Sequence, residues 1–288
     1  MNSRTADILK VMGLTSLAMV AFAGNSILCR LALRTSSIDP VSFTAIRLLS
    51  GSVLLVAVIA MRSNFSIGGS WLASLYLFGY AAGFSIAYLY VPASVGALLL
   101  FGAVQVTMIL AGFLRGERLS GRQWVGFIFA FAGLVLLLLP GLGTPSVVGS
   151  ILMVLAGVCW GLYSLKGTKS GDATKATAGN FLRAAVLSLV LSAFFLSSVR
   201  VSTDGFLLAV ASGTITSGMG YAIWFVVVKR LKSFEAAVIQ LSVPVLTALL
   251  GLTFLGEDFS LTFLIPGGVV LGGILVVLVG KRQLEKKD

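Results

Sequence analysis

Long apolar stretches alternate with short polar connections along the whole chain. A helix that crosses the hydrocarbon core of a bilayer needs about 20 predominantly apolar residues, because no water is present there to satisfy the backbone. Ten stretches meet this requirement, which predicts an all-α membrane protein of ten transmembrane helices. The stretches cover residues 11–33, 40–61, 71–91, 93–114, 122–140, 147–166, 176–198, 205–228, 234–255 and 261–280.

The ten spans form two sets of five with related sequences. Residues 113–120 read Phe-Leu-Arg-Gly-Glu-Arg-Leu-Ser, and residues 253–260 read Thr-Phe-Leu-Gly-Glu-Asp-Phe-Ser, with Gly, Glu and Ser identical at an offset of 140 residues. An odd number of spans per repeat places the second copy upside down in the membrane, as in many secondary transporters. We therefore expect two inverted five-helix repeats, residues 1–140 and 141–288, around a central cavity.

Two further matches relate the halves. The segment Phe22-Ala-Gly-Asn-Ser26 in the first span is similar to Trp160-Gly-Leu-Tyr-Ser164 in the sixth. Arg47 in the second span has a counterpart in Arg183 of the seventh. Inversion predicts that the two arginines lie toward opposite faces of the membrane.

The distribution of basic residues predicts the orientation. Of the 21 Lys and Arg residues, 16 fall on the side of the membrane that holds the N-terminus and 3 on the other side, while Arg47 and Arg183 lie within spans. Because basic residues concentrate in cytoplasmic loops, both termini are expected in the cytoplasm.

Composition supports a protein that lies almost wholly in the membrane. Hydrophobic residues make up 58% of the 288 residues and charged residues only 11%, against roughly 25% charged in soluble domains. The net charge of +11 does not indicate nucleic-acid binding, since the basic residues lie at span ends and form no single patch. Cys29 and Cys159 fall inside apolar spans and are expected to pack there.

These features resemble the drug/metabolite transporter superfamily, in particular its EamA-type ten-span branch. The resemblance lies in the related motifs of spans 1 and 6, the arginines of spans 2 and 7, and the Gly-Glu pairs before spans 5 and 10. It implies a cavity lined by spans 1, 3, 4, 6, 8 and 9, with spans 5 and 10 peripheral. Within this branch the chain is most similar to bacterial inner-membrane exporters of aromatic and neutral amino acids. The usual Trp-Gly of the first motif reads Phe22-Ala23 here.

The residue types for several kinds of chemistry are missing from the spans. The chain has no His, and its ten acidic residues fall in loops, tails or span ends. Proton-coupled transporters usually keep an ionisable side chain inside the membrane. We therefore expect no enzyme activity, no metal site, no cofactor and no carboxylate-driven proton antiport.

Polar uncharged and aromatic side chains at mid-membrane depth are the candidate substrate-binding residues. Those on span 3 recur every four residues, which places them on one helix face, and an amide facing lipid would be costly if unsatisfied. The alternatives are hydrogen bonding between helices for the tyrosines and interhelical contacts for the amides. The candidates are Asn25, Tyr80, Phe84, Gln105, Trp160, Tyr163, Tyr221, Trp224 and Gln240.

A second group is expected to have structural or gating roles. Arg47 and Arg183 could bind a substrate carboxylate, but pairing with backbone carbonyls or snorkelling is favoured. Glu117 and Glu257 open spans 5 and 10, and Ser120-x-x-Gln123 is typical of a capping box. Pro244 can kink span 9 beside the cavity.

Close helix contact is expected at one further motif. Gly268-x-x-x-Gly272 in span 10 allows two helices to approach, and we expect this contact within the monomer, with a dimer face as the alternative.

The sequence favours an inner-membrane exporter of small organic metabolites, most of all aromatic or neutral amino acids, working by alternating access. Its partners are the solute and membrane lipid, and no nucleic acid. Export of drugs, nucleosides or sugars by a member of the same superfamily is one alternative. A membrane scaffold or lipid-handling protein without solute flux is another.

Overall fold

The computed structural model describes residues 3–34, 37–62, 64–91, 93–138, 146–255 and 261–284. Within these ranges the chain is helical, and the single β-type pairing is an isolated bridge between Ile38 and Val201. The helices are α1 (Ser3–Arg34), α2 (Pro40–Ala60), α3 (Trp71–Ala87), α4 (Ala93–Leu114), α5 (Gly121–Leu138), α6 (Val147–Gly167), α7 (Ala173–Ala193), α8 (Thr203–Ala211), α9 (Gly220–Val228), α10 (Ser233–Gln240), α11 (Ser242–Leu255) and α12 (Leu261–Leu284), with a 3₁₀ turn η2 (Leu196–Ser198) and a π-helical segment η3 (Ser212–Met219).

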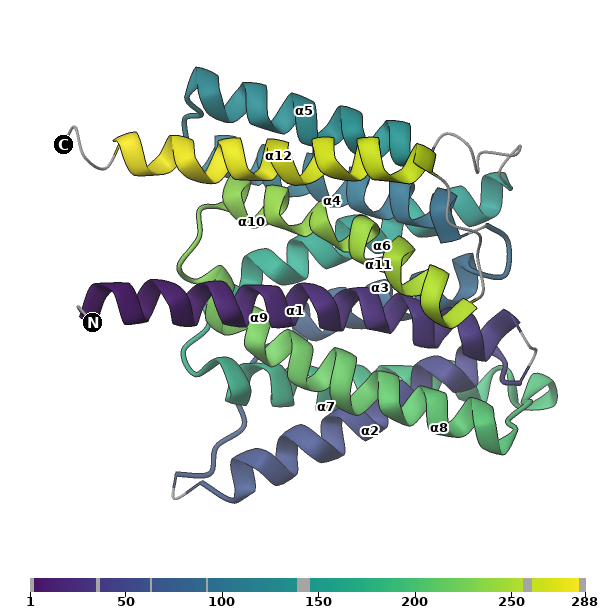
Figure 1. Cartoon of the computed structure of the whole chain (residues 1–288). Helices are drawn as coiled ribbons and strands as arrows, with labels where there is room; N and C mark the ends of the chain where they lie inside the picture. Colours follow the sequence, from purple (N-terminus) through teal and green to yellow (C-terminus); the bar gives the residue numbers. More distant parts are fainter. Residues whose placement is uncertain are drawn as a thin grey trace.

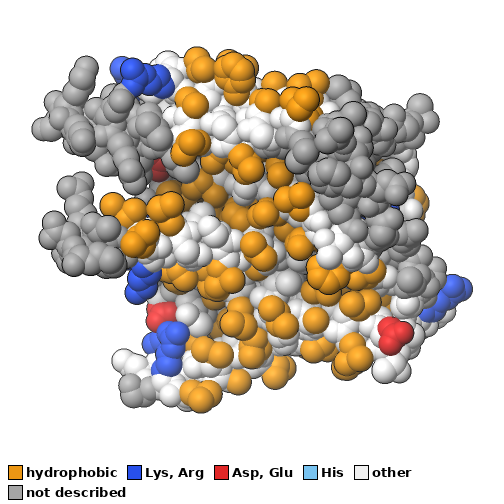
Figure 2. Space-filling model, in the orientation of Figure 1, with side chains coloured by type: hydrophobic (Ala, Val, Ile, Leu, Met, Phe, Trp, Pro, Cys, Tyr) orange, Lys and Arg blue, Asp and Glu red, His pale blue; other side chains and the backbone are white. Residues whose placement is uncertain are grey.

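The helices lie side by side along one common direction, and the start of α1 and the end of α12 lie at the same end of the bundle (Figure 1). In the described part of the chain, six helical segments are long and apolar enough to cross a bilayer: Asp7–Leu33, Pro40–Ala60, Val147–Gly167, Ala173–Ala193, Thr203–Val228 and Ser233–Gly251. Trp71–Ala87, Leu99–Leu114 and Gly268–Val277 are shorter apolar helices. Figure 2 shows a hydrophobic side surface with Lys and Arg side chains toward the ends of the bundle.

The segments predicted as spans 8 and 9 are not simple α-helices. The eighth is α8, η3 and α9 in succession, and η3 is a π-helix. In the ninth, α10 ends at Gln240 and α11 begins at Ser242. Pro244 follows that break and cannot donate a backbone hydrogen bond to Gln240 one turn earlier. Pro244, which the sequence indicated as a kink, therefore explains the break between α10 and α11.

Contacts between helices recur when each helix is replaced by the matching helix of the other half of the chain. The contact of α4 with α6 is matched by that of α1 with α11, and the contact of α3 with α6 by that of α1 with α9. Between the halves, α2 packs on α7, α4 on α10 and α5 on α12. The pair α5 and α12 lies along one side of the bundle, with α2 and α7 toward the opposite side (Figure 1).

Small residues allow α5 and α12 to touch. A Cβ added to Gly126 would lie 2.8 Å from the carbonyl oxygen of Gly273, and one added to Gly273 would lie 2.5 Å from the nitrogen of Ala130. The expectation that Gly268 and Gly272 make the helix contact within the monomer was wrong, since a Cβ at either would meet nothing within 4 Å. Gly273 lies next in sequence but on the face that α5 covers.

At the end of the bundle away from the termini, the loop before α2 docks on the segment before α8. Asp39 N donates to Arg200 O at 2.9 Å, and Arg200 N donates to the Asp39 carboxylate at 2.9 Å. The same carboxylate caps α2 by accepting from Val41 N and Ser42 N. We name residues 37–39 together with 200–202 the Asp39 latch.

A similar contact closes the other end. The Asp172 carboxylate caps α7 by accepting from Lys175 N, and it forms an ion pair with Arg62 at 3.1 Å. Gly68 N donates to Lys175 O, and Ser70 N donates to Asn180 Oδ1. We name residues 62 and 64–70 together with 172–180 the Asp172 latch. Each latch joins one half of the chain to the other.

Candidate functional site

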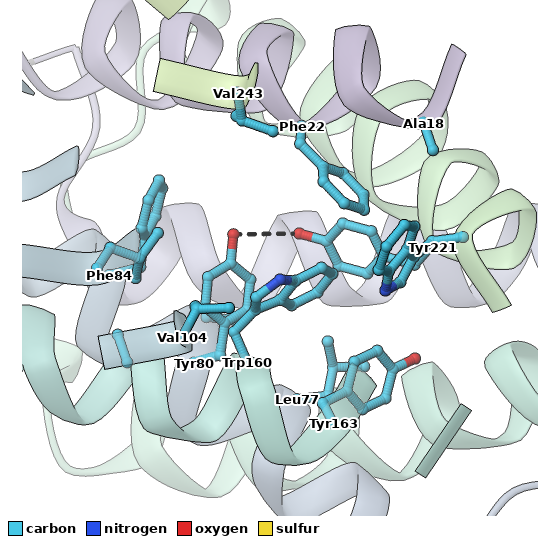
Figure 3. Packing of buried hydrophobic residues seen from close by; sticks show 14 of the residues in the cluster. Ala18, Phe22, Leu77, Tyr80, Phe84, Val104, Trp160, Tyr163, Tyr221 and Val243 are labelled. Carbon is cyan, nitrogen blue, oxygen red and sulfur yellow. Dashed lines mark hydrogen bonds between the residues drawn. The ribbon is translucent and has the colours of Figure 1, made fainter. Parts of the chain in front are cut away.

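Aromatic side chains from four helical segments meet in the middle of the bundle. The Trp160 ring on α6 lies 4.9 Å from Tyr80 on α3, 4.7 Å from Tyr221 on α9 and 5.0 Å from Phe22 on α1, measured between centroids. Phe84 lies 5.4 Å from Tyr80, one turn farther along α3. Figure 3 shows Phe22 on one side of the paired Tyr80 and Tyr221 hydroxyls and Trp160 on the other. We name these five residues the aromatic cluster.

The aromatic cluster surrounds a small cavity. The cavity volume is about 10 Å³, which is roughly enough for one water molecule. Its lining residues are Phe22, Ser26, Tyr80, Phe84, Leu100, Phe101, Trp160 and Tyr221. A pocket for a drug-sized ligand measures roughly 300–1,000 Å³, so the rings must separate before a solute of that size enters. The structure therefore has the site closed.

Asn25 connects α1 to the π-helical segment η3 and to the cluster. Its Oδ1 accepts from Ser212 Oγ at 2.7 Å and from Ser217 Oγ at 3.3 Å, and its Nδ2 donates to Tyr80 Oη at 3.4 Å. The π-helix brings Ser212 and Ser217 to the same side, and such segments are frequent at functional sites. The amide is thus satisfied by protein groups and faces the cluster.

Both glutamines donate to backbone carbonyls of α10, and Gln240 also contacts Trp160. Trp160 Nε1 donates to Gln240 Oε1 at 2.6 Å, and Gln240 Nε2 donates to Ala236 O at 2.9 Å. Gln105 Nε2 donates to Ala237 O at 2.6 Å, while its buried Oε1 accepts no hydrogen bond. Neither glutamine lines the cavity, but Gln240 fixes the ring that does.

Arg47 lies directly behind the cavity wall. Its side chain is fully buried, its Nε donates to Ser217 Oγ at 2.8 Å, and an Nη atom donates to Tyr221 Oη at 2.5 Å. Its guanidinium carbon lies 5.4 Å from the Tyr80 ring centroid and 5.9 Å from that of Phe84. These are cation–π distances. The backbone carbonyls of helix ends, which the sequence favoured as partners of Arg47, are not among these contacts.

Arg183 has the environment that was expected of both arginines. One Nη atom donates to Gly68 O at 2.9 Å and to Gly179 O at 3.0 Å. Its guanidinium carbon lies 5.8 Å from the ring of Trp71, an exposed residue at the start of α3. Arg183 therefore holds the Asp172 latch to α7 and does not reach the aromatic cluster.

Glu117 joins the two halves at another point. Its carboxylate accepts from Ser233 N at 3.1 Å, Ser233 Oγ at 2.8 Å and Phe234 N at 3.4 Å, and so it caps the start of α10. Its predicted counterpart Glu257 lies outside the described residues. The predicted capping box at α5 is confirmed, since Ser120 N donates to Gln123 Oε1 and Gln123 N donates to Ser120 Oγ.

The structure brings most predicted substrate-binding residues together, but at different depths. Tyr80, Phe84, Trp160 and Tyr221 line the cavity, whereas Tyr163 and Trp224 are buried outside it. Trp224 Nε1 donates to Ser164 Oγ at 3.1 Å, and the Tyr163 ring lies 5.7 Å from Trp160. Both rings pack against residues of the aromatic cluster, Tyr163 against Trp160 and Trp224 against Phe22.

Sequence reasoning missed Phe22, Ser26, Leu100 and Phe101 as cavity-lining residues. Phe22 occupies the place in the first motif that Trp160 occupies in the second, so the repeat carried a signal for it. The others are ordinary apolar or small residues of long spans, and only helix rotation reveals them. In the described residues, no group of three or more His, Cys, Asp or Glu could hold a metal ion.

Comparison with known proteins accounts for this architecture. The model of the EamA-like transporter family matches twice, over residues 9–139 and 147–279. The chain belongs to the EamA-like transporter family. It is therefore a transporter of the drug/metabolite superfamily, which confirms the resemblance seen in the sequence, and the family is not one of enzymes.

Individual relatives cover nearly the whole chain. An uncharacterized protein of Pseudomonas aeruginosa is 48% identical over 92% of this chain and 93% of its own. The aromatic amino acid exporter YddG of Ancylobacter novellus is 27% identical over 94% of this chain and all of its own. A protein of known crystal structure superposes with a TM-score of 0.75 at 25% identity, covering 92% of this EamA-like chain and 97% of its own.

Proposed function

We propose that this EamA-like transporter exports aromatic or other neutral amino acids across a bacterial cytoplasmic membrane. The carrying observation is the buried aromatic cluster around a cavity at the meeting of α1, α3, α4, α6 and α9. Ring faces and edges bind an apolar or aromatic side chain. They also attract an ammonium group through cation–π contacts. The similarity to an aromatic amino acid exporter supports this substrate class.

The proposed mechanism is alternating access between two inverted five-helix repeats. Support comes from the double family match, from the helix contacts that survive exchange of the halves, and from a latch at each end of the bundle. When one latch opens and the other holds, the cavity faces one side of the membrane. Reversal of the latches then exposes it to the other side.

In the proposed orientation both termini lie in the cytoplasm. The excess of Lys and Arg at the end that carries the termini supports this. The Asp172 latch then faces the cytoplasm, and the Asp39 latch faces outward. Labelling of single cysteines placed in residues 64–68 and at 200–202 with a membrane-impermeant reagent in intact cells tests this assignment. Labelling of the first site without the second would reverse it.

Transport is proposed to follow the solute gradient without proton coupling. No acidic side chain contacts the aromatic cluster in the described part of the chain, and the buried Glu235 lies at the start of α10, where its carboxylate accepts from Lys232 N. A proton-coupled carrier would need a titratable group at the site. A pH gradient should therefore not drive accumulation of phenylalanine in liposomes. Uphill accumulation would refute this part of the proposal.

The test is flux through the purified chain in liposomes loaded with radiolabelled phenylalanine, with leucine and ethidium as comparison solutes. We expect phenylalanine efflux well above that of protein-free liposomes, and a loss of at least tenfold in Trp160→Ala. The matched control is Trp124→Ala, which removes a part-exposed indole on α5 far from the cavity and should keep the parental rate. Ethidium flux without phenylalanine flux would indicate a drug exporter, and flux of neither solute would favour a scaffold.

A further inference from the structure

Arg47 is a buried charge that no acidic side chain of the described residues pairs. Its side chain is fully buried, and the ion pair found within 4 Å in the described residues is Arg62 with Asp172, at the end of the bundle. A charge removed from water and left unpaired is expensive, and in membrane proteins such residues usually serve function. The guanidinium of Arg47 is therefore a positive charge beside the cavity, and no acidic side chain among the described residues neutralises it.

The contrast with Arg183 separates a structural arginine from this one. The two residues are repeat equivalents at an offset of 136, yet Arg183 donates to two backbone carbonyls. Arg47 donates instead to two side-chain hydroxyls, and its Nη1 is buried without any acceptor. Hydroxyls are neutral partners that do not balance the charge, so the guanidinium retains capacity for an anion.

The bonds around Arg47 also point toward the cavity. A guanidinium can only donate, so the Tyr221 oxygen accepts from Arg47 and the Tyr221 proton is free to go to Tyr80, whose oxygen lies 3.3 Å away (Figure 3). The Tyr80 oxygen also accepts from Asn25 Nδ2. The remaining Tyr80 hydroxyl proton has no acceptor among these contacts. The chain of donors thus begins at a charge and ends at a residue that lines the cavity.

We propose that Arg47, Tyr221 and Tyr80 form the site for the negatively charged group of the transported solute, a carboxylate in the case of an amino acid. The carboxylate would neutralise the buried charge and accept from the Tyr80 hydroxyl and from Arg47 Nη1, two charge-assisted contacts. The inference rests on the proposed function and deepens it, because it makes the substrate an organic anion or zwitterion with an apolar body. It excludes purely cationic solutes.

Four probes that differ only in their charged groups test the site. They are phenylalanine, 3-phenylpropionate, which lacks the ammonium group, and phenylalaninamide and phenethylamine, which lack the carboxylate. Thermal-shift binding to the purified full chain and liposome flux are measured for each probe. We expect the two carboxylates to be recognised at least tenfold better than the two probes without one.

Variants then assign that preference to residues. Arg47→Gln and Tyr80→Phe should abolish the ratio between phenylalanine and phenylalaninamide, and Arg47→Lys should restore part of it. The control Arg183→Gln should lower the melting temperature but leave the ratio unchanged, because Arg183 contacts backbone carbonyls at the Asp172 latch. A purely structural Arg47 would lower recognition of all four probes equally. The ratio in the parental chain and in Tyr80→Phe decides the matter even where Arg47→Gln does not fold.

The outcomes for the two proposals differ. Equal recognition of phenylalanine, phenylalaninamide and phenethylamine overturns the anion site and leaves the proposed amino-acid transport standing. Recognition of 3-phenylpropionate but not of phenylalanine supports the anion site and overturns amino-acid export. Recognition of none of the four probes overturns both.

Discussion

The Phe22 ring meets the indole of Trp160 edge-on, with centroids 5.0 Å apart and planes at 86°. The two residues are equivalents in the two repeats, at an offset of 138. Tyr80 and Tyr221, at an offset of 141, likewise touch through their hydroxyls at 3.3 Å. Each pair joins a residue of the first half of the chain to a residue of the second half. The cavity between them is thus where a solute would contact both halves at once.

The indole nitrogen of Trp160 provides a first prediction. Trp160→Phe removes the donor to Gln240 Oε1 and leaves that buried oxygen without its partner, which costs about 1–3 kcal/mol. We expect a lower melting temperature in detergent and a several-fold lower phenylalanine flux. Trp224→Phe is the matched control, since it removes a bond to Ser164 Oγ outside the cavity. It should destabilise similarly and affect flux less. Equal flux losses would show that the cavity assignment is wrong.

The contact between α5 and α12 predicts opposite outcomes for neighbouring glycines. Gly273→Ala places a methyl 2.5 Å from Ala130 N and 2.6 Å from Gly126 O, so the helices must separate. We expect a loss of about 1–3 kcal/mol, seen as a lower melting temperature. Gly268→Ala, on the open face of the same helix, should leave the melting temperature unchanged or slightly raised. Destabilisation by Gly268→Ala alone would place a partner on that face.

Because Glu117 caps α10, we expect a substitution at Glu117, which does not line the cavity, to lower the stability of the fold. Glu117→Gln keeps the shape of the side chain but replaces one oxygen, so some of the three donors from Ser233 and Phe234 lose their acceptor. Loss of a helix cap costs about 0.5–2 kcal/mol. Thermal unfolding of the purified chain measures the effect, with Arg118→Gln in the adjacent exposed position as the control. No difference between the two variants would contradict the capping role.

The Asp39 latch predicts a conformational effect that the native thiols report. Asp39→Ala removes the acceptor of Arg200 N and the cap of α2, and so favours opening at that end. Cys29 is buried near this end of α1. In a Cys159→Ser background, we expect Cys29 to react several-fold faster with a water-soluble methanethiosulfonate in Asp39→Ala. Asp172→Ala, which weakens the opposite latch, is the control and should not accelerate this reaction. Unchanged reactivity in Asp39→Ala would rule out a gating role for the latch.

The latches also predict a dependence on acid pH. Burial raises the pKa of Asp39, but hydrogen bonds from the backbone N–H of Arg200, from the side chain and backbone of Ser42 and from the backbone of Val41 together outweigh burial and hold this pKa below its ordinary value. The pKa of Asp172 is also lowered, chiefly by the Lys175 N–H, against some burial and with help from Arg62. The ionised carboxylates of Asp39 and Asp172 therefore each stabilise the folded state. This stabilisation is fully present above the unfolded pKa of about 3.9 and is lost as the pH falls through the lower pKa of the folded state.

The corresponding measurement is the melting temperature between pH 7 and pH 3. We expect it to fall at the acid end, and to fall less in the double variant Asp39→Asn with Asp172→Asn. A parallel fall in the parental chain and the double variant would show that these carboxylates do not set the acid sensitivity.

The sequence by itself determined the apolar helical segments and the EamA-like identity. Both depend on local properties, because a span must be apolar along its length and a family is recognised from short motifs such as Gly116-Glu117. Side-chain type also located half of the residues that line the cavity, because aromatic residues such as Tyr80, Trp160 and Tyr221 stand out inside apolar spans.

The tertiary structure decided what each polar side chain contacts. Arg47 and Arg183 look alike in sequence, yet one donates to hydroxyls beside the cavity and the other to backbone carbonyls at a latch. Phe22 became a cavity residue because its ring faces Trp160. The rotation of each helix about its axis fixes such partners, and that rotation follows from close packing against several neighbours at once. Hydropathy along the chain contains no such information.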